Sequence, residues 1–228
     1  MSPISVITPV FNGERYLAEA LQSIHAQTLS PTEVIVVNDG SSDRSADIAS
    51  SFESTRLLNI PHAGVGVARN QGVRAATGTL LAFLDADDLW LPHALESLLS
   101  PLLADPQLDA VFGGVQHFVS EDCPAETAKK YFVQQGAGNE KMCGAMLIRS
   151  RSFHRAGGFD EGGAVDFIGW YQRAQEAGLR MAVIAPVVLR RRIHGSNTTI
   201  LHRAEVQRDY LALVRESLAR RRASGGAG

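Results

Sequence analysis

Four short apolar runs, rich in β-branched residues, recur along the first third of the chain. Each has the length of a strand and is hydrophobic almost without interruption, which is typical of strands buried on both faces of a parallel sheet. The runs are Ile4 to Val10, Glu33 to Val37, Leu57 to Ile60 and Thr79 to Leu84. They predict the central strands of one sheet.

Helical patterns lie between these runs. Apolar residues recur at helical spacing from Tyr16 to Ile24, a second helix is expected from about Ser45 to Phe52, and a third from Gly66 to Ala76. Alternating strands and helices predict an α/β sheet with right-handed crossovers. In such sheets ligands bind at the carboxyl ends of the strands, so a site is expected there.

The second half of the chain is less regular. Its pattern predicts a helix that begins near Leu89 to Pro92 and ends near Ala104, and a loop from Glu121 to Gln135. Further elements are expected at Ala110 to Val115 (strand), Met142 to Arg149 (strand), Phe167 to Ala177 (helix) and Met181 to Val188 (strand). Residues 201–222 predict a C-terminal helix with one apolar side, and residues 223–228 a frayed, disordered tail.

Composition narrows the class of protein. With 228 residues and neither an internal repeat nor a linker, one compact domain is expected. A formal net charge of -2 argues against a general nucleic-acid binder, which usually carries a strongly basic face. No secretory leader and no run of roughly 18 to 20 apolar residues is recognised, so a cytoplasmic protein is expected. Cys123 and Cys143 are too few for a disulfide framework and are expected to be reduced thiols.

Three acids, Asp85, Asp87 and Asp88, follow the strand at Thr79 to Leu84 within four positions. If the chain stays extended there, Asp85 and Asp87 point to one side, where they could hold a hard divalent cation while phosphate oxygens complete its shell. Such a cation stabilises a departing diphosphate as a Lewis acid. A helix cap would explain one acid but not three. The cluster therefore predicts a metal and phosphate site.

The cluster also resembles the DxD motif of glycosyltransferase family 2, which has the GT-A fold. Four other segments match that family in the same order: Thr8 to Gly13, Val36 to Asp43, Ala68 to Gly72 and Gly157 to Glu161. The similarity covers roughly residues 2–200. It implies a GT-A fold, a single-domain, mixed but mostly parallel sheet flanked by helices, with a donor-binding half at about 1–90 and an acceptor-facing half at about 91–200.

The resemblance implies an inverting, metal-dependent transfer of a sugar from a nucleotide sugar, with UDP as the expected nucleotide and Mn²⁺ or Mg²⁺ as cofactor. Asp39 follows a buried strand in a turn-forming run, where its carboxylate could accept hydrogen bonds from a base or form an Asx-turn. In the family the matching aspartate binds the base. The remaining donor-binding residues implied by the match are Thr8, Pro9, Phe11, Arg69, Asp85, Ala86 and Asp87. A core role for Phe11 and a solvated helix face for Arg69 are the alternatives.

An acceptor that attacks a sugar must lose a proton, and a carboxylate suits that task. The family places its base in a Glu-Asp pair after the Gly157 to Glu161 segment, and Asp166 matches the second position. Val165 stands where the family has glutamate, so Asp160 and Glu161 compete for the role. Asp166 could also cap the helix that carries Trp170, which in turn could stack on a sugar or fill the core.

A late histidine of the family, near its metal or diphosphate, matches His194, so the predicted metal ligands are Asp85, Asp87 and His194. Arg192 beside it could neutralise phosphate charge. The acceptor, a glycan, lipid, peptide or small molecule, is not identified, although the polar segment from Glu121 to Gly138 could face it. Peripheral membrane contact through the basic C-terminal helix and a homodimer are further candidate interactions.

Two other functions remain open. A sugar-phosphate nucleotidyltransferase shares a nucleotide-binding α/β layout and metal carboxylates, but the segment from Phe11 to Arg15 matches its glycine-rich loop poorly. A non-catalytic nucleotide-sugar-binding protein is suggested by the missing acid at Val165.

Overall fold

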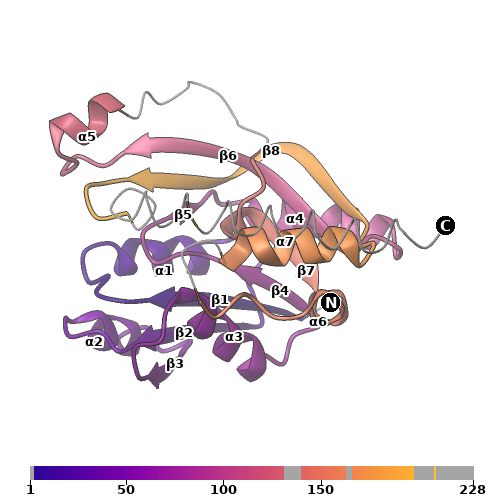
Figure 1. Cartoon of the computed structure of the whole chain (residues 1–228), viewed down its shortest axis with the longest axis horizontal. Coiled ribbons are helices and arrows are strands. Elements are labelled where there is room, and N and C mark those ends of the chain that lie inside the picture. The colour runs from indigo at the N-terminus through magenta and orange to yellow at the C-terminus, as the bar shows by residue number, and fades with distance from the viewer. Residues whose placement is uncertain (1–2, 131–139, 163–165, 198–207, 209–228) are drawn as a thin grey trace.

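The computed structural model describes residues 3–130, 140–162, 166–197 and 208. One mixed sheet of eight strands forms its centre, in the order β3-β2-β1-β4-β7-β6-β8-β5 (Figure 1). The strands are β1 (Ile4–Val10), β2 (Glu33–Asp39), β3 (Thr55–Ile60), β4 (Leu80–Phe83), β5 (Leu89–Trp90), β6 (Ala110–Val119), β7 (Met146–Arg149) and β8 (Met181–Ile193).

The strand directions bring six carboxyl ends to one edge. Strand β1 is parallel to β2 and β4, β2 is parallel to β3, and β6 is parallel to β8. Strand β7 runs antiparallel to both β4 and β6, so β6 and β8 point the same way as β4. Only β7 and β5 run the other way. The predicted mixed, mostly parallel α/β sheet is therefore confirmed.

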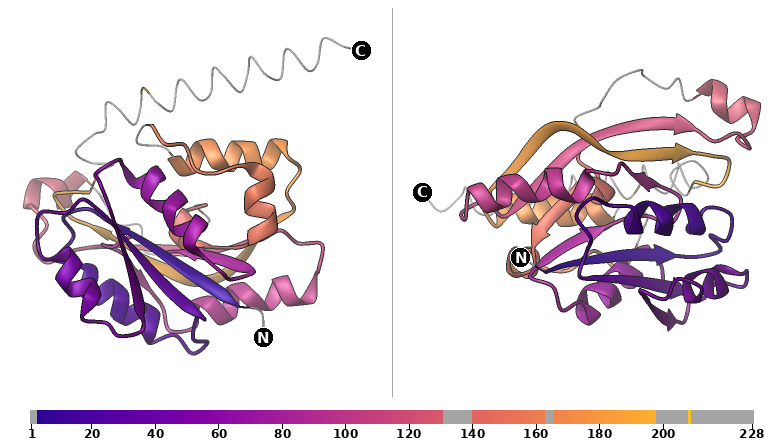
Figure 2. Two further views of the ribbon diagram at one scale, coloured as in Figure 1. Left: turned by 90° about the horizontal axis from the view of Figure 1, so that it is seen from below. Right: turned by 180° about the vertical axis from the view of Figure 1, so that it is seen from behind.

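Helices cover both faces of the sheet, as two views at right angles show (Figure 2). One face packs against α1 (Leu17–His25), α2 (Ser45–Ser50) and α4 (Ala94–Ala104), and the other against α3 (Val65–Ala75), α6 (Ser150–Ala156) and α7 (Asp166–Glu176). Neighbouring strand residues alternate between the layers: Val6 joins the first core and Ile7 the second. This period of two explains why the strands read as continuous apolar runs.

Several predicted elements have different bounds in the structure. The expected start of a helix at Leu89 to Pro92 is wrong, because Leu89–Trp90 is β5 and pairs with β8, while α4 begins only at Ala94. The Trp90 indole N–H donates to the Gly144 carbonyl at 2.7 Å, which fixes this short strand.

The loop expected from Glu121 to Gln135 is also wrong in part. It contains α5 (Ala125–Lys130), and residues 131–139 lie outside the described residues. Strands β6 and β8 run on to Val119 and Ile193 because they pair with each other along their length. Only Met146–Arg149 of the predicted strand at 142–149 is a strand, since Cys143–Ala145 forms a 3-10 turn.

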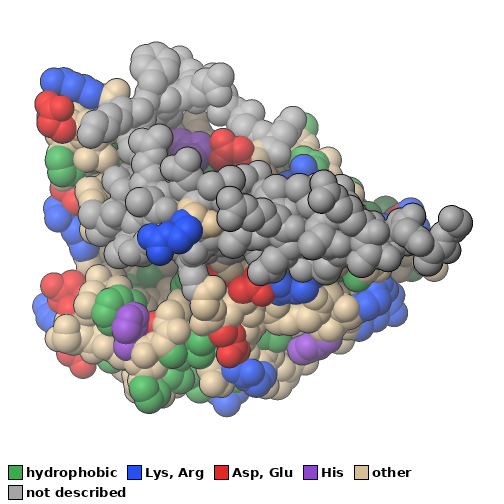
Figure 3. Space-filling view, viewed as in Figure 1, with side chains coloured by type: hydrophobic (Ala, Val, Ile, Leu, Met, Phe, Trp, Pro, Cys, Tyr) green, Lys and Arg blue, Asp and Glu red, His purple; other side chains and the backbone are tan. Residues whose placement is uncertain are grey.

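The predicted C-terminal helix (201–222) and tail (223–228) lie outside the described residues, apart from residue 208. Within the described part of the chain, no helix is long and apolar enough to span a membrane. On the face shown in Figure 3, basic and acidic side chains of the described residues are interspersed.

Candidate functional site

The four residues Asp85-Ala86-Asp87-Asp88 form a turn between β4 and β5 rather than an extended segment. The Asp88 backbone N–H donates to the Asp85 carbonyl at 3.1 Å, which closes the turn. Consequently the side chains of Asp85 and Asp87 have separate partners, Arg69 and His194. The extended chain on which the expected common orientation of Asp85 and Asp87 depended is therefore not present.

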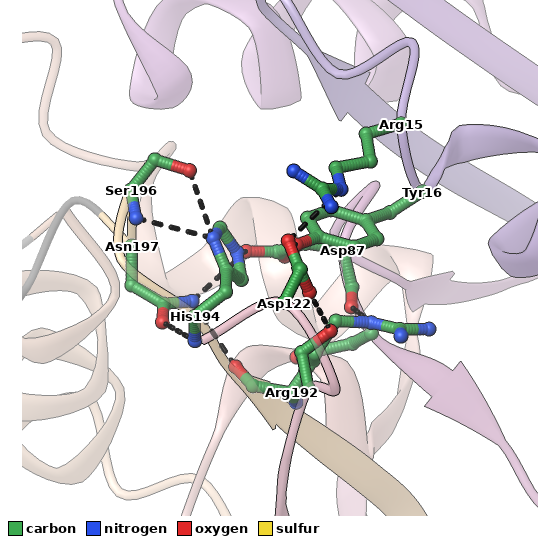
Figure 4. A network of polar contacts seen from close by, with 10 residues as sticks. Arg15, Tyr16, Asp87, Asp122, Arg192, His194, Ser196 and Asn197 are labelled. Atoms are coloured by element: carbon green, nitrogen blue, oxygen red, sulfur yellow. Dashed lines mark hydrogen bonds and ion pairs between the residues drawn. The ribbon is translucent and has the colours of Figure 1, made fainter. Parts of the chain in front are cut away.

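Asp87 contacts the loop that follows β8. Its Oδ2 lies 2.9 Å from Nε2 of His194 and 3.2 Å from Nδ2 of Asn197. The Asn197 side chain also accepts the His194 backbone N–H at 2.6 Å, and Nδ1 of His194 lies 2.8 Å from the Ser196 hydroxyl. Figure 4 shows Asp87, Ser196 and Asn197 around His194, with Asp87 and Ser196 on the two ring nitrogens. Asp87 and His194, which are 107 positions apart in the sequence, thus meet at the edge of the sheet where the carboxyl ends of the strands lie.

The His194 ring rests against an aromatic ring from the start of α1. Tyr16 lies with its ring centroid 4.7 Å from that of His194, and the Arg192 guanidinium lies 4.6 Å from the Tyr16 centroid. Arg192 donates to the Asp87 carbonyl at 2.9 Å and to Glu19 at 2.7 Å. In this structure Arg192 therefore holds the turn and α1, and its guanidinium already has protein partners.

The Tyr16 hydroxyl is anchored by a carboxylate beyond β6 (Figure 4). It donates to Asp122 at 2.5 Å, and Arg15 pairs with the same carboxylate at 2.9 Å. Hydrogen bonds from Ser120 and Tyr16 lower the pKa of Asp122 to about 2. Burial, and then the Asp122 carboxylate, raise the pKa of Tyr16 above its ordinary value. The hydroxyl therefore remains a hydrogen-bond donor at neutral pH.

Asp88, the third acid, is buried and ties the turn to β8. Its Oδ1 accepts the Arg192 backbone N–H at 2.9 Å. Burial, then the negative charges of Asp87 and Asp85, raise the pKa of Asp88 well above its usual range. Asp88 thus neither caps a helix nor faces solvent as a ligand.

Arg69 of α3 bridges two carboxylates and is almost fully buried, with 5% exposure. Its guanidinium lies 2.5 Å from Asp85 and 2.5 Å from Asp166. Burial opposes its charge, but the two carboxylates outweigh that effect and hold the pKa of Arg69 well above its ordinary value. The alternative of a solvated helix-face arginine is therefore wrong.

Asp166 begins α7 and is 5% exposed. Its competitors for the role of base have other partners: Asp160 pairs with Arg173 at 2.6 Å, and Glu161 accepts a hydrogen bond from Asn70 at 3.0 Å. Val165 lies outside the described residues. Of the three carboxylates, Asp166 is the one joined through Arg69 to the acidic turn.

Trp170 belongs to the core. It is 0% exposed and packs among the rings of Phe153, Phe159 and Phe167, with centroids 5.5, 5.9 and 5.9 Å away. The alternative in which it stacks on a bound sugar is wrong for this conformation, since no face of its ring is free.

The predicted nucleotide-binding residues lie at the ends of β1 and β2. Asp39 is 2% exposed, and its carboxylate accepts the backbone N–H groups of Ala63 at 2.8 Å and Gly64 at 2.9 Å. These partners are 24 and 25 residues away, so the bonds are not those of an Asx-turn. Phe11 is 48% exposed, so the alternative of a core role is wrong.

The neighbours of Phe11 on β1, Thr8 and Pro9, are buried in the sheet. Thr8 Oγ1 has no hydrogen-bond partner among the described residues. A buried polar atom near the predicted pocket is thus without a partner in the described part of the chain.

Asp87 and His194 have the chemistry of metal ligands, a carboxylate and an imidazole nitrogen beside each other. Among the described residues, no group of three or more His, Cys, Asp or Glu side chains is placed to hold a metal ion. Mn²⁺ and Mg²⁺ bound with phosphates commonly take only one or two protein ligands. The pair fits such a shared site, whereas Asp85 is turned toward Arg69.

Sequence reasoning missed several residues of this region, above all Tyr16, Asp122 and His62. Tyr16 showed only as an apolar position of the first helix, and its partner Asp122 lies 106 residues away. No local signal marks such a pair. The spacing of Tyr16 and Glu19, one helical turn apart, is typical of any helix and does not indicate a site.

The chain resembles known proteins in both sequence and fold. Residues 5–158 match the profile of Glycosyl transferase family 2. Glycosyltransferase alr2836 of Nostoc sp. is 43% identical over 101 residues, which cover 42% of this chain and 31% of the relative. YibD of Escherichia coli is 40% identical over 106 residues, 45% of this chain and 31% of the relative. Chondroitin synthase of Pasteurella multocida is 27% identical across 97% of this chain but only 24% of its own length.

Among solved structures, TarS 1-349 of S. aureus in complex with UDP superposes with a TM-score of 0.68 at 19% identity, covering 84% of this chain and 60% of that one. Its complex with UDP-GlcNAc gives 0.69 at 18% identity, with 86% and 60% covered. These likenesses show the GT-A fold. The matched segments span 31% of the length of each of the first two curated relatives. Since the family profile covers most of its length, the chain belongs to glycosyl transferase family 2.

Proposed function

We propose that this chain is a metal-dependent, inverting glycosyltransferase that transfers a sugar from a UDP-sugar to an acceptor in a single displacement. The observation that carries the proposal is the 2.9 Å contact between Oδ2 of Asp87 and Nε2 of His194. It joins the acidic turn after β4 to the loop after β8, at the edge of the sheet where ligands bind in α/β folds.

Asp87 and His194 would hold Mn²⁺ or Mg²⁺ together with the donor's phosphates. A divalent ion bound there supplies positive charge to the departing diphosphate. Asn197 and Ser196 orient the imidazole by their hydrogen bonds to it and to its backbone. The Tyr16 ring, which packs against the imidazole at a tilt of 47°, limits its rotation. Partners of this kind fix the orientation of a ligating histidine.

Asp166 is proposed as the base that takes the proton from the acceptor hydroxyl. Inversion needs the acceptor to attack from the face opposite the leaving diphosphate, so no covalent nucleophile on the protein is required. Arg69 balances the negative charge of Asp166 and also holds Asp85 in the turn, at 2.5 Å from each. One buried side chain thereby fixes the base relative to the acidic turn.

The nucleobase is proposed to bind beside Asp39 and Phe11, with Thr8 and Pro9 behind them. Phe11 is one of the few large apolar side chains exposed on the described surface, and base rings stack on such faces. The TarS structures with UDP and UDP-GlcNAc support a uridine donor by similarity of fold.

Thermal unfolding with a panel of nucleotide sugars and Mn²⁺ tests the donor class. We expect a UDP-sugar to stabilise the protein, and we expect this stabilisation to require the metal. A ligand at 100 times its dissociation constant adds about 2.7 kcal/mol to the free energy of unfolding, which a melting experiment detects. Release of UDP from the stabilising donor, measured with candidate acceptors, would then report transfer.

Three results would contradict this assignment. The first is that no nucleotide sugar stabilises the protein. The second is release of pyrophosphate from a nucleoside triphosphate. The third is that the protein binds the donor but shows neither transfer nor slow hydrolysis of the donor. The last two would favour the nucleotidyltransferase and the non-catalytic protein, respectively.

A further inference from the structure

Two rings that follow different strands lie stacked at the proposed base pocket. Phe11 comes after β1 and His62 after β3, yet their ring centroids are 4.0 Å apart and their planes are inclined by only 20°. The Phe11 side chain is otherwise open to solvent, and the His62 side chain is 56% exposed. An aromatic face that would accept a nucleobase is therefore covered by a surface side chain.

The same imidazole also covers Asp39. Its Nδ1 lies 2.9 Å from the carboxylate Oδ2 and 3.1 Å from the backbone carbonyl oxygen of Asp39. Both of these atoms are acceptors, so Nδ1 carries a proton and donates it. A carboxylate that is only 2% exposed thus receives one of its hydrogen bonds from a side chain on the surface.

His62 therefore makes the two contacts that a base such as uracil would make: a planar heterocycle stacked on Phe11 and a ring N–H donated to Asp39. We propose that His62 is a place-holder for the donor's nucleobase, which must displace the imidazole to bind, and that the pocket consequently selects bases with a ring N–H. This inference rests on the proposed nucleotide-sugar donor and identifies the residue that its base replaces.

The backbone around His62 is held in place. Gly40, with φ of +72°, lies so close to this segment that a Cβ there would be 2.8 Å from the His62 backbone nitrogen. The loop after β3 is also fixed by the hydrogen bonds of Ala63 and Gly64 to Asp39. We therefore expect displacement to occur by rotation of the His62 side chain, which is 56% exposed, into solvent.

The carboxylate of Asp39 accepts hydrogen bonds, and this determines which nucleobases the pocket selects. When the imidazole leaves, the carboxylate keeps the backbone N–H groups of Ala63 and Gly64 but loses its third donor, which a ring N–H of the incoming base would replace. Uracil, thymine and guanine carry a ring N–H at neutral pH. Cytosine instead presents the lone pair of N3, which a carboxylate repels.

Calorimetric titration with UDP and with CDP, in Mn²⁺, tests the place-holder. We expect His62→Ala to bind UDP about three- to tenfold more tightly than the wild type, the range that corresponds to removing one competing aromatic stack. CDP is expected to bind more weakly than UDP to both proteins. The matched control is His25→Ala, which removes another exposed histidine stacked on a phenylalanine, Phe52, and should leave UDP affinity unchanged. His25 contacts Thr55 at the start of β3, at the opposite edge of the sheet.

Equal or weaker UDP binding by His62→Ala, with the wild type binding UDP, would overturn the place-holder while leaving the proposed function intact. CDP binding as tight as that of UDP would overturn the selection of bases. Failure of both proteins to bind UDP or any other nucleotide would overturn the proposed function and this inference together. UDP binding gained only in His62→Ala would support the inference.

Discussion

At the scale of single residues, the buried guanidinium of Arg69 has two carboxylate partners on different elements. Asp85 belongs to the turn after β4 and Asp166 to the start of α7. Removing a buried cation leaves the negative charges of its partners without a neutralising charge. This lowers the free energy of unfolding more than the loss of an exposed ion pair does. Arg69 is therefore expected to support both the stability and the geometry of the site.

We predict that Arg69→Met lowers the free energy of unfolding by about 3 kcal/mol and abolishes most of the transfer activity. Chemical denaturation and UDP release measure the two effects. Arg74→Met, on the same helix, is the control. The Arg74 side chain is 57% exposed and its guanidinium lies 3.8 Å from Glu161, so a loss below about 1 kcal/mol is expected. Equal losses in the two variants would contradict the role assigned to Arg69.

The resemblance to the family located the acidic turn, Asp39 and His194, and in the structure these residues end or follow strands whose carboxyl ends meet at one edge. The sequence could not show that Asp87 contacts His194 while Asp85 contacts Arg69, since this depends on a turn at Ala86. Whether these residues bind donor, metal and acceptor as assigned stays a prediction.

At the scale of elements, α3 approaches the segment after α6 with no room for a side chain. A Cβ on Gly66 would lie 2.0 Å from the Asp160 carbonyl oxygen and 3.3 Å from Cβ of Asp166. This close approach sets α3, which carries Arg69, against the start of α7. The glycine is therefore required by packing, although alanine is the better helix former.

We predict that Gly66→Ala lowers the free energy of unfolding by about 1–3 kcal/mol, because overpacking forces backbone shifts, and that it reduces activity as Asp166 moves. Denaturation and initial rates of UDP release measure this. Gly162→Ala, whose added Cβ would meet no atom of the described residues within 4 Å, should be close to neutral. A Gly66→Ala variant as stable and as active as the wild type would refute the packing argument.

Asp109, at the start of β6, connects three elements away from the site. Its carboxylate accepts hydrogen bonds from Ser152 at 2.5 Å, the Arg180 backbone at 2.8 Å and Arg155 at 2.9 Å. Burial alone would raise the pKa of Asp109, but these bonds and the nearby Arg155 charge outweigh it and lower that pKa below its usual value. The ionised carboxylate is thus favoured by folding.

Because the folded-state pKa is the lower one, this stabilisation is present above the unfolded pKa of about 3.9 and is lost as pH falls through the folded value. We predict that Asp109→Asn destabilises the protein by about 1–3 kcal/mol at pH 7, and that the difference shrinks below about pH 4. Denaturation at several pH values measures it. Asp105→Asn, which breaks a mostly exposed pair with Arg180, should cost less, and a pH-independent gap for Asp109→Asn would contradict the argument.

At the scale of the whole molecule, the alternation of strands and helices in the first 85 residues could be predicted from the sequence. Buried parallel strands are hydrophobic on both faces, so they stand out from the helices between them. The second half was predicted less well because β5 has two residues, α6 was not marked by any motif and α5 lies in a polar segment. Their positions depend on pairing with β8 and on packing against α7, which no local pattern records.

The division into donor-binding and acceptor-facing halves stays a prediction. The sheet does join both proposed halves: β4 pairs with β1 on one side and with β7 on the other. The acidic turn follows β4, so it lies where the two sets of strands meet. An acceptor bound over β6 and α7 would therefore face a donor bound over β1 and β2.

Calorimetric titration of UDP with and without Mn²⁺, on the wild type and on Asp87→Asn, tests the central claim most directly. The asparagine keeps an oxygen that can contact His194, so a loss of binding would report the missing charge and not a lost fold, which the melting temperature would check. We predict metal-dependent UDP binding by the wild type and a loss of at least about tenfold in the variant. Equal, metal-dependent binding by both proteins would contradict a metal and diphosphate site at Asp87, as would a failure of both the wild type and His62→Ala to bind UDP.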